Sequence, residues 1–320
     1  VPMHLTRGVA LFLGLISAAQ GAQNATKPPA VALETVAAAV RQADKAHPRL
    51  FANAGAFEDL QRFTVTNDLG QLARGRICFE ADQMQAFKPC ERTMEGRRLL
   101  GISRRTLHRV SVLAMAFRLT GKRVYRDRCV QEMCAVSAFS DWNPSHFLDV
   151  AEMTLALAVG YDWLYTDLDE ATRKTVAQAI LEKGLQTSLK STGWVKASNN
   201  WGQVCHAGML AGALALMDQQ EPLAIRIAHR AVVHFPLSMK AFDPKGSYPE
   251  GPGYWSYGTD FNVLALALLE GVLKSDFGLS AQPGFKETAD YLDLVTGPSG
   301  LTFNYADGGM GRSTDCATWW

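Results

Sequence analysis

The chain has 320 residues, of which 48% are hydrophobic and 20% are charged, and its formal net charge at neutral pH is +1. This composition excludes an intrinsically disordered chain, because it provides enough apolar surface for a large core. The small net charge also argues against general nucleic-acid binding, which depends on a strongly basic surface. We therefore expect a globular protein of one large domain or two smaller ones.

The N-terminus has the pattern of an export signal. A short basic region that ends at Arg7 precedes an apolar run over 8–19, and small residues follow up to Gly21. The run is shorter than the roughly 20 residues that a membrane-spanning helix needs, so it predicts a signal peptide over 1–21. We expect a secreted or periplasmic protein with no transmembrane segment, in which residues 22–46 form a leader or linker.

Cysteine pairing is compatible with export. Six cysteines are present, at positions 78, 90, 129, 134, 205 and 316. Cys78 and Cys90 flank a loop-like segment and are the pair that we expect to form a disulfide. No arrangement of cysteine and histidine has zinc spacing, so we expect neither a metal nor another cofactor.

Helical periodicity dominates the chain after the leader. The expected helices cover 106–119, 122–137, 148–164, a stretch from the Asp167/Glu170 capping box to Leu189, 206–217, 222–235, 259–274 and 284–295. Alternation typical of a β-strand is weak everywhere before 301–305.

Two kinds of helix are visible in this pattern. The helix after Asp167 has one apolar face and predicts an outer helix, whereas 148–164 and 206–217 are apolar nearly all round and predict inner ones. His206 lies on the second inner helix, where a packing or capping role is favoured. Because no repeat of fixed period is visible, a closed ring is favoured over a solenoid. We expect an all-α fold, an (α/α) toroid or incomplete barrel of antiparallel helix pairs over 47–300.

The most informative stretch is GSYPEGPGYWSY, at 246–257. Gly251, Pro252 and Gly253 disfavour regular structure, so we expect the aromatics that follow to lie on a shaped loop rather than in a helix. Loops that present tyrosine and tryptophan from a rigid scaffold often bind or transform a ligand. The segment at 199–206 also places polar groups and an aromatic ahead of a helix. Together the two segments predict a site for a polar, sugar-like ligand.

A series of motifs resembles the heparinase II/III-like polysaccharide lyases. The motifs are HPRLF (47–51), WNPSHFLD (142–149) leading to GYDWLY (160–165), NNW (199–201), YPEGPGYW (248–255) and FNYADGG (303–309). The resemblance covers about residues 47–312 and implies a helical toroid followed by a large β-sandwich domain. It therefore implies that 301–320 is the start of a truncated β-domain, which would complete the active-site cleft and supply a histidine to it.

The resemblance also implies a reaction, the β-elimination of a uronic acid in an acidic polysaccharide. This reaction needs a group that neutralises the C5 carboxylate, a base for the C5 proton and an acid for the leaving oxygen at C4. A carboxamide suits the first task, and a phenol suits proton transfer. The resemblance assigns these roles to Asn200 and Tyr254, with Asn199 as the fallback for Asn200. A helix N-cap for Asn200 and loop packing for Tyr254 are the structural alternatives.

Further residues are candidate substrate contacts. They are Asn199, Trp201, His146, Glu250, Trp255, Tyr257, Arg104 and Arg105. The aromatic rings can stack on sugars, and the arginines can bind a carboxylate or sulfate. Glu250 can orient the phenol or the substrate. Each of these residues also has an ordinary structural role open to it, as core packing, a satisfied histidine, a loop salt bridge or a solvated charged face.

Two rival functions stay open. A glycoside hydrolase on the same scaffold needs two carboxylates roughly 5–10 Å apart, for which Glu250 with Asp149 or Asp260 are the candidates. The third possibility is a carbohydrate-binding module without turnover. The products distinguish these functions, because only elimination yields an unsaturated sugar that absorbs in the ultraviolet.

Overall fold

The computed structural model describes residues 31–309 and residue 311, and the expected signal peptide over 1–21 lies outside this range. The described residues form helices and loops without a β-strand, apart from the isolated bridges Glu95–Arg98 and Thr296–Thr302. The expectation of an all-α fold is confirmed. No helix in the described part of the chain combines the length and hydrophobicity that crossing a membrane would require.

The helices are α2 (Leu33–Gln42), α3 (Ala54–Thr66), α4 (Asp68–Met84), α5 (Leu100–Thr120), α6 (Arg123–Ser137), α7 (Phe147–Leu164), α8 (Glu170–Ala179), α9 (Thr187–Lys190), α10 (Asn200–Ala215), α11 (Glu221–Met239), α12 (Pro252–Leu273) and α13 (Tyr291–Leu294). Of these, α3 and α4 were not predicted from the sequence. A π-helical stretch, η2 (Ile180–Gln186), joins α8 to α9, and η1 (Tyr165–Asp167), η3 (Lys240–Phe242), η4 (Leu279–Ala281) and η5 (Glu287–Asp290) are 3-10 turns.

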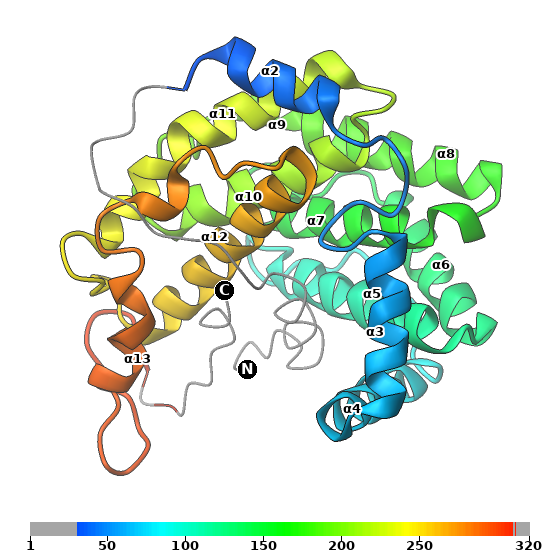
Figure 1. The fold of residues 1–320 in the computed structure, drawn as a ribbon, viewed down its shortest axis with the longest axis horizontal. Helices are drawn as coiled ribbons and strands as arrows, with labels where there is room; N and C mark the ends of the chain where they lie inside the picture. The colour runs from blue at the N-terminus through cyan, green and yellow to red at the C-terminus, as the bar shows by residue number, and fades with distance from the viewer. Residues whose placement is uncertain (1–30, 310, 312–320) are drawn as a thin grey trace.

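Four largely buried helices, α5, α7, α10 and α12, lie side by side in that order (Figure 1). Ser103 near the start of α5 contacts Glu152 near the start of α7, and Val110 further along α5 lies against Gly160 of α7. These two pairs show that α5 and α7 run in the same direction. Every residue of α7 is buried, so its apolar surface is covered on all sides as the sequence predicts.

Glycine allows α10 to lie very close to α7. A Cβ atom added at Gly208 would lie 2.3 Å from the carbonyl oxygen of Ala151, and one at Gly212 would lie 2.6 Å from Cγ2 of Thr154. Both distances are below van der Waals contact, so an alanine at either position would force the helices apart. The glycines of α10 thus allow close packing, and the order of the two contacts makes α10 parallel to α7.

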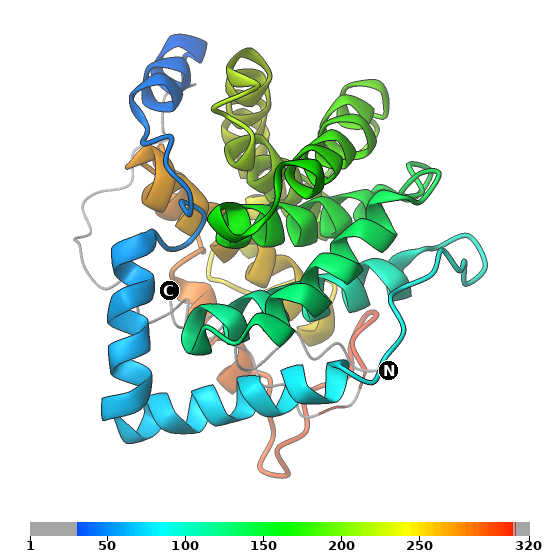
Figure 2. The same ribbon diagram turned by 90° about the vertical axis from the view of Figure 1, so that its right-hand side faces the viewer.

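Outer helices pack antiparallel against the inner ones, as Figures 1 and 2 show. Arg109 and Val110 of α5 contact Glu132 and Cys129 of α6, respectively, so the two helices are antiparallel. The stretch α8–η2–α9 lies along α7, and α11 lies along α10. The parallel inner helices therefore direct their N-terminal ends to one side of the molecule.

The structure corrects the start of several helices. Helices α5 and α10 begin six residues before the expected 106 and 206 (106 minus 100 and 206 minus 200). The N-cap of α8 is Asp169, whose Oδ1 accepts a 2.7 Å hydrogen bond from the backbone N–H of Thr172, and not Asp167. Helix α12 begins at Pro252, seven residues before the expected 259 (259 minus 252). Proline suits the first helical turn because its missing N–H would have no intrahelical partner there. Tyr254, Trp255 and Tyr257 therefore lie in a helix, and the prediction that they lie on a loop is wrong.

Other expectations differ in detail. The expected leader contains α2, whose buried face packs against α11. The stretch expected to be helical over 284–295 holds only the short η5 and α13, and Thr302 makes the single bridge within 301–305. The expected disulfide is also wrong, because Cys78 and Cys90 are both free.

Candidate functional site

The N-terminal ends of the inner helices bring most of the predicted site residues to one end of the helix layer. Arg104 lies in the first turns of α5, His146 is the N-cap of α7, Asn200 is the first residue of α10, and Tyr254 is in the first turn of α12. These residues are distant in sequence, and the parallel packing of the helices brings them to the same end.

Helices α10 and α12 are in direct contact about one turn from their starts. The hydroxyl of Tyr248 donates a 3.1 Å hydrogen bond to Oε1 of Gln203, and Gly258 lies so near that an added Cβ would be 2.0 Å from the same oxygen. The carboxylate of Glu250, in the loop before α12, accepts a hydrogen bond from the backbone N–H of Asn200. The first turns that carry Asn200 and Tyr254 are therefore neighbours.

The two asparagines at the start of α10 have different environments. Asn199 is the N-cap, and its side-chain oxygen accepts a 3.2 Å hydrogen bond from the backbone N–H of Trp201. Asn199 thus has the capping role that the sequence left open for Asn200. Asn200 is only 2% exposed, beneath Glu250. Tyr254 is half-buried, and its hydroxyl has no hydrogen-bond partner among the residues that the structure describes.

Glu250 is not held by a salt bridge to any described residue, which removes the structural alternative considered for it. Its Oε2 is buried and lacks a hydrogen-bond partner among the described residues. Burial raises the pKa of this carboxyl, and the charge of Asp307 adds to the effect. Glu250 is therefore an acid in a partly desolvated position beside the catalytic candidates.

A buried carboxylate that the sequence analysis missed joins three inner helices. Oε1 of Glu152 accepts hydrogen bonds from the Tyr257 hydroxyl at 2.6 Å and from Nε of Arg104 at 3.4 Å. Oε2 accepts one from Oγ of Ser103 at 3.1 Å, and the residue is 1% exposed. Burial raises the pKa of Glu152 to about 7. The available sequence signal was an acidic residue within a helix that is apolar nearly all round.

His146 and Asp149 form a second polar group at the start of α7. Nδ1 of His146 lies 2.7 Å from Oδ1 of Asp149, and its ring meets that of Trp201 edge-on at 5.0 Å. Oδ2 of Asp149 accepts hydrogen bonds from the backbone N–H of Leu99 and from Nδ2 of Asn143, and Asp149 is fully buried. Asp149 thus organises the ends of α5 and α7 and does not face a ligand.

Two predicted sugar-stacking rings are buried. Trp255 is 0% exposed, with Nε1 donating to Oγ1 of Thr288 at 2.8 Å, and Tyr257 is 5% exposed. Their rings cannot reach a sugar in this structure, so the stacking prediction is wrong for both. Trp201 stays partly exposed, Arg104 is partly buried over the Tyr257 ring at 4.9 Å, and Arg105 is exposed.

His206 has the packing role that the sequence favoured. It is 1% exposed, and its Nε2 lies 3.0 Å from the carbonyl oxygen of Val195. Burial lowers its pKa to about 3, with smaller contributions from Arg230 and His234. An imidazole that stays neutral and buried is not a candidate for contact with the substrate.

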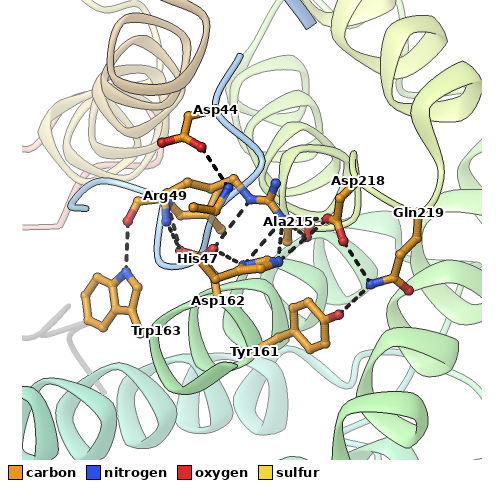
Figure 3. A network of polar contacts seen from close by, with 11 residues as sticks. Asp44, His47, Arg49, Tyr161, Asp162, Trp163, Ala215, Asp218 and Gln219 are labelled. Carbon is orange, nitrogen blue, oxygen red and sulfur yellow. Dashed lines mark hydrogen bonds and ion pairs between the residues drawn. The ribbon is translucent and has the colours of Figure 1, made fainter. Parts of the chain in front are cut away.

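A separate polar network lies at the other ends of α7 and α10 (Figure 3). Oδ1 of Asp162 contacts Nδ1 of His47 at 2.6 Å, and Oδ2 accepts hydrogen bonds from the backbone N–H groups of Arg49 and Leu50 at 2.9 and 2.7 Å. Nη2 of Arg49 reaches Oδ1 of Asp218 at 2.5 Å. The HPRLF and GYDWLY motifs therefore contact each other, and they anchor the segment before α3 rather than the candidate site.

Within the described residues, no group of three or more His, Cys, Asp or Glu side chains is arranged to hold a metal ion. Comparison with protein-family models finds none that matches this chain, and a search of curated proteins finds no significant match.

Proposed function

We propose that the protein is a polysaccharide lyase that cleaves a uronic-acid-containing glycan by β-elimination, with Asn200 and Tyr254 as its catalytic pair. The observation that carries the proposal is their position in the first turns of the neighbouring helices α10 and α12. We also propose that the helix pairs form part of an (α/α) toroid. The shared direction of the inner helices and the return of the outer ones support this arrangement.

Electrostatics favour an acidic ligand at this end of the molecule. The unpaired N–H groups at a helix N-terminus carry a partial positive charge, which attracts carboxylates and other anions. Four inner helices direct their N-termini this way, and the exposed Arg105 near the start of α5 adds a formal charge, whereas Arg104 is paired with Glu152. Glu250 already accepts a hydrogen bond from the N-terminus of α10, which illustrates the preference.

Tyr254 is the better candidate for proton transfer among the tyrosines of α12. The hydroxyl of Tyr257 is committed to Glu152, and burial together with the Glu152 charge raises the pKa of Tyr257 well above its ordinary value. Tyr257 therefore stays a neutral hydrogen-bond donor. The Tyr254 hydroxyl has no such partner among the described residues, so it is free to exchange a proton with a substrate.

Asn200 has the role of neutralising the substrate carboxylate. Asn200 is 2% exposed, and Glu250 accepts a hydrogen bond from its backbone N–H. We propose that substrate binding displaces the Glu250 side chain, so that the substrate carboxylate takes its place at the start of α10 and meets the Asn200 amide.

The hydrolase alternative has less support. Asp149 is fully buried, and its Oδ2 accepts hydrogen bonds from Leu99 and Asn143. Asp260 is partly buried within α12. A hydrolytic pair needs two carboxyl groups that reach the sugar from opposite sides of the scissile bond. Only Glu250 among these three acids lies in a loop that can approach a ligand.

The test is a screen of the full-length protein against alginate, heparin, heparan sulfate and a neutral glycan, with ultraviolet absorbance and reducing ends measured together. A lyase increases both signals on an acidic glycan and neither on the neutral one. New reducing ends without ultraviolet absorbance would identify a hydrolase. Binding without either signal would identify a carbohydrate-binding module and contradict the proposal.

A further inference from the structure

A cavity of about 560 Å³ lies between α11 and the segment that joins α9 to α10. Its volume is within the range of small-molecule sites, roughly 300–1,000 Å³. One wall is a face of α11, and the other wall is formed by residues between Leu189 and Lys196. None of the candidate catalytic residues lines it, so it is a separate feature of the fold.

All the ionisable groups that line this cavity are basic. They are Lys196, Arg226, His229, Arg230 and His234. The spacing of those on α11 corresponds to successive turns of one helix face, which aligns them along the wall. Lys196 faces them from the opposite side, and no acidic side chain from the described residues contributes to the lining.

The positive charges are not neutralised within the described part of the chain. Lys196 and Arg226 are exposed, and neither makes an ion pair or hydrogen bond there. Burial, together with the neighbouring charge of Arg226, lowers the pKa of Arg230 to about 10. Burial also lowers the pKa of His234, with contributions from Lys196, Arg230 and His229. An anion in the cavity would relieve this repulsion.

Arg230 is held rigidly in the wall. Nη1 donates to the carbonyl oxygen of Ser188 and Nη2 to its hydroxyl, both at 2.8 Å, and the guanidinium lies 4.9 Å from the centre of the Trp194 ring. Its Nε is buried and has no hydrogen-bond partner among the described residues. A charged group with fixed geometry and an unused donor loses little entropy when it binds an anion.

We propose that this cavity is a binding site for an oxyanion, a carboxylate, sulfate or phosphate group, either free or carried on a sugar. Lys196 and Arg226 supply mobile charges at its edge, and Arg230 supplies a fixed one. The inference does not depend on the proposed lyase function, because the site lies apart from Asn200 and Tyr254 and its test measures binding only.

The affinity should rise as the pH falls, because an anion favours the protonated form of His234. The groups that face this imidazole are Lys196 from the loop, His229 and Arg230 from α11, and His206 from α10, whose ring lies 6.1 Å from that of His234. Nε2 of His229 also contacts the carbonyl oxygen of Val31, at 3.1 Å.

Calorimetric titration of the full-length protein with glucuronate, inorganic sulfate, inorganic phosphate and glucose tests the proposal. The Lys196→Gln/Arg226→Gln variant should bind the anions at least about tenfold more weakly, because it loses two charge-assisted contacts. The matched control is Lys174→Gln/Lys240→Gln, which removes the same charge from exposed residues outside the cavity and should bind as the wild type does. Glucose should not bind.

If only glucuronate binds, the natural ligand carries its carboxylate on a sugar. If all three anions bind, the site accepts a free oxyanion. Both results support the site. Equal weakening in the two variants, or no saturable binding of any anion below about 10 mM, would overturn it. Proton NMR of the wild type gives a second test that needs no variant. The anion should raise the pKa of His234, and an unchanged titration at saturating anion would contradict the proposal.

Discussion

The hydroxyl of Tyr257 donates a 2.6 Å hydrogen bond to Oε1 of Glu152, across 105 positions of sequence. Arg104 of α5 contacts both residues, its Nε 3.4 Å from the same carboxylate and its guanidinium 4.9 Å from the tyrosine ring. The first turns of α5, α7 and α12 are thus held together by a buried group that titrates. Stability and the geometry of the candidate site should therefore depend on the same proton.

Glu152 should make the stability of the protein fall as the pH rises through a defined window. Its folded pKa of about 7 lies above the ordinary value of 4.5 for a glutamate, so the folded protein binds the extra proton between these values. Stability is then greatest below about pH 4.5 for this group and declines up to about pH 7, by about 3 kcal/mol at ~1.36 kcal/mol per unit. Urea unfolding of the wild type and Glu152→Gln from pH 5 to 8 measures the difference.

The glutamine variant should lack this part of the pH dependence, because its amide does not titrate. The control is Glu58→Gln, at an exposed position of α3, which should keep the wild-type profile. Parallel profiles for the wild type and Glu152→Gln would show that Glu152 is ionised throughout the range.

The network in Figure 3 should contribute much more to stability than a surface ion pair. Asp162 is fully buried and accepts hydrogen bonds from His47, Arg49 and Leu50, so Asp162→Ala leaves several donors unpaired. We expect a loss of about 3–5 kcal/mol in the free energy of unfolding. The control, Asp59→Ala, removes an exposed partner of Arg62 and should cost less than about 1 kcal/mol. Similar losses for both would contradict the account.

The rate at which each free cysteine is alkylated should follow the exposure of its side chain. Cys78 and Cys134 are partly exposed, whereas Cys90, Cys129 and Cys205 are buried. Burial raises the pKa of Cys90 to about 11, which leaves little of the reactive thiolate at neutral pH. Native-state maleimide labelling with peptide mapping should modify Cys78 and Cys134 first, and the others only on unfolding. A peptide in which Cys78 is linked to Cys90 would contradict the structure.

The sequence predicted the helices well where their hydrophobic pattern is long. The ranges 122–137 and 148–164 agree with α6 and α7 to within one residue at each end. The start of α12 was missed because Gly251, Pro252 and Gly253 suggest a loop, although proline also suits a first helical turn. The helical pattern predicted that 148–164 and 206–217 are inner helices. It did not reveal Glu152, because the partners of this carboxylate come from helices that only the tertiary fold brings together.

Alanine variants of Asn199 and Asn200 should have different effects, because Asn199 caps α10 and Asn200 is the catalytic candidate. Asn199→Ala removes the N-cap hydrogen bond to Trp201 and should lower the free energy of unfolding by about 1 kcal/mol while most of the activity remains. Asn200→Ala leaves the cap in place, and it should raise KM and lower kcat, because its contact to the carboxylate exists before and during the reaction. If Asn199→Ala is the variant that loses activity, the catalytic assignment moves to Asn199.

The most direct test of the central claim is the turnover of Tyr254→Phe in the full-length protein, on an acidic glycan that the wild type cleaves. The substitution removes only a hydroxyl that has no partner among the described residues, so folding and glycan affinity should be retained. Formation of the ultraviolet-absorbing product should fall by about 10²–10⁴-fold or more, the value of a positioned acid–base group. Tyr257→Phe is the matched control, because it removes the buried hydroxyl bonded to Glu152 and should mainly lower stability. A Tyr254→Phe protein that binds the glycan and keeps most of the wild-type rate would show that Tyr254 is neither the base nor the acid.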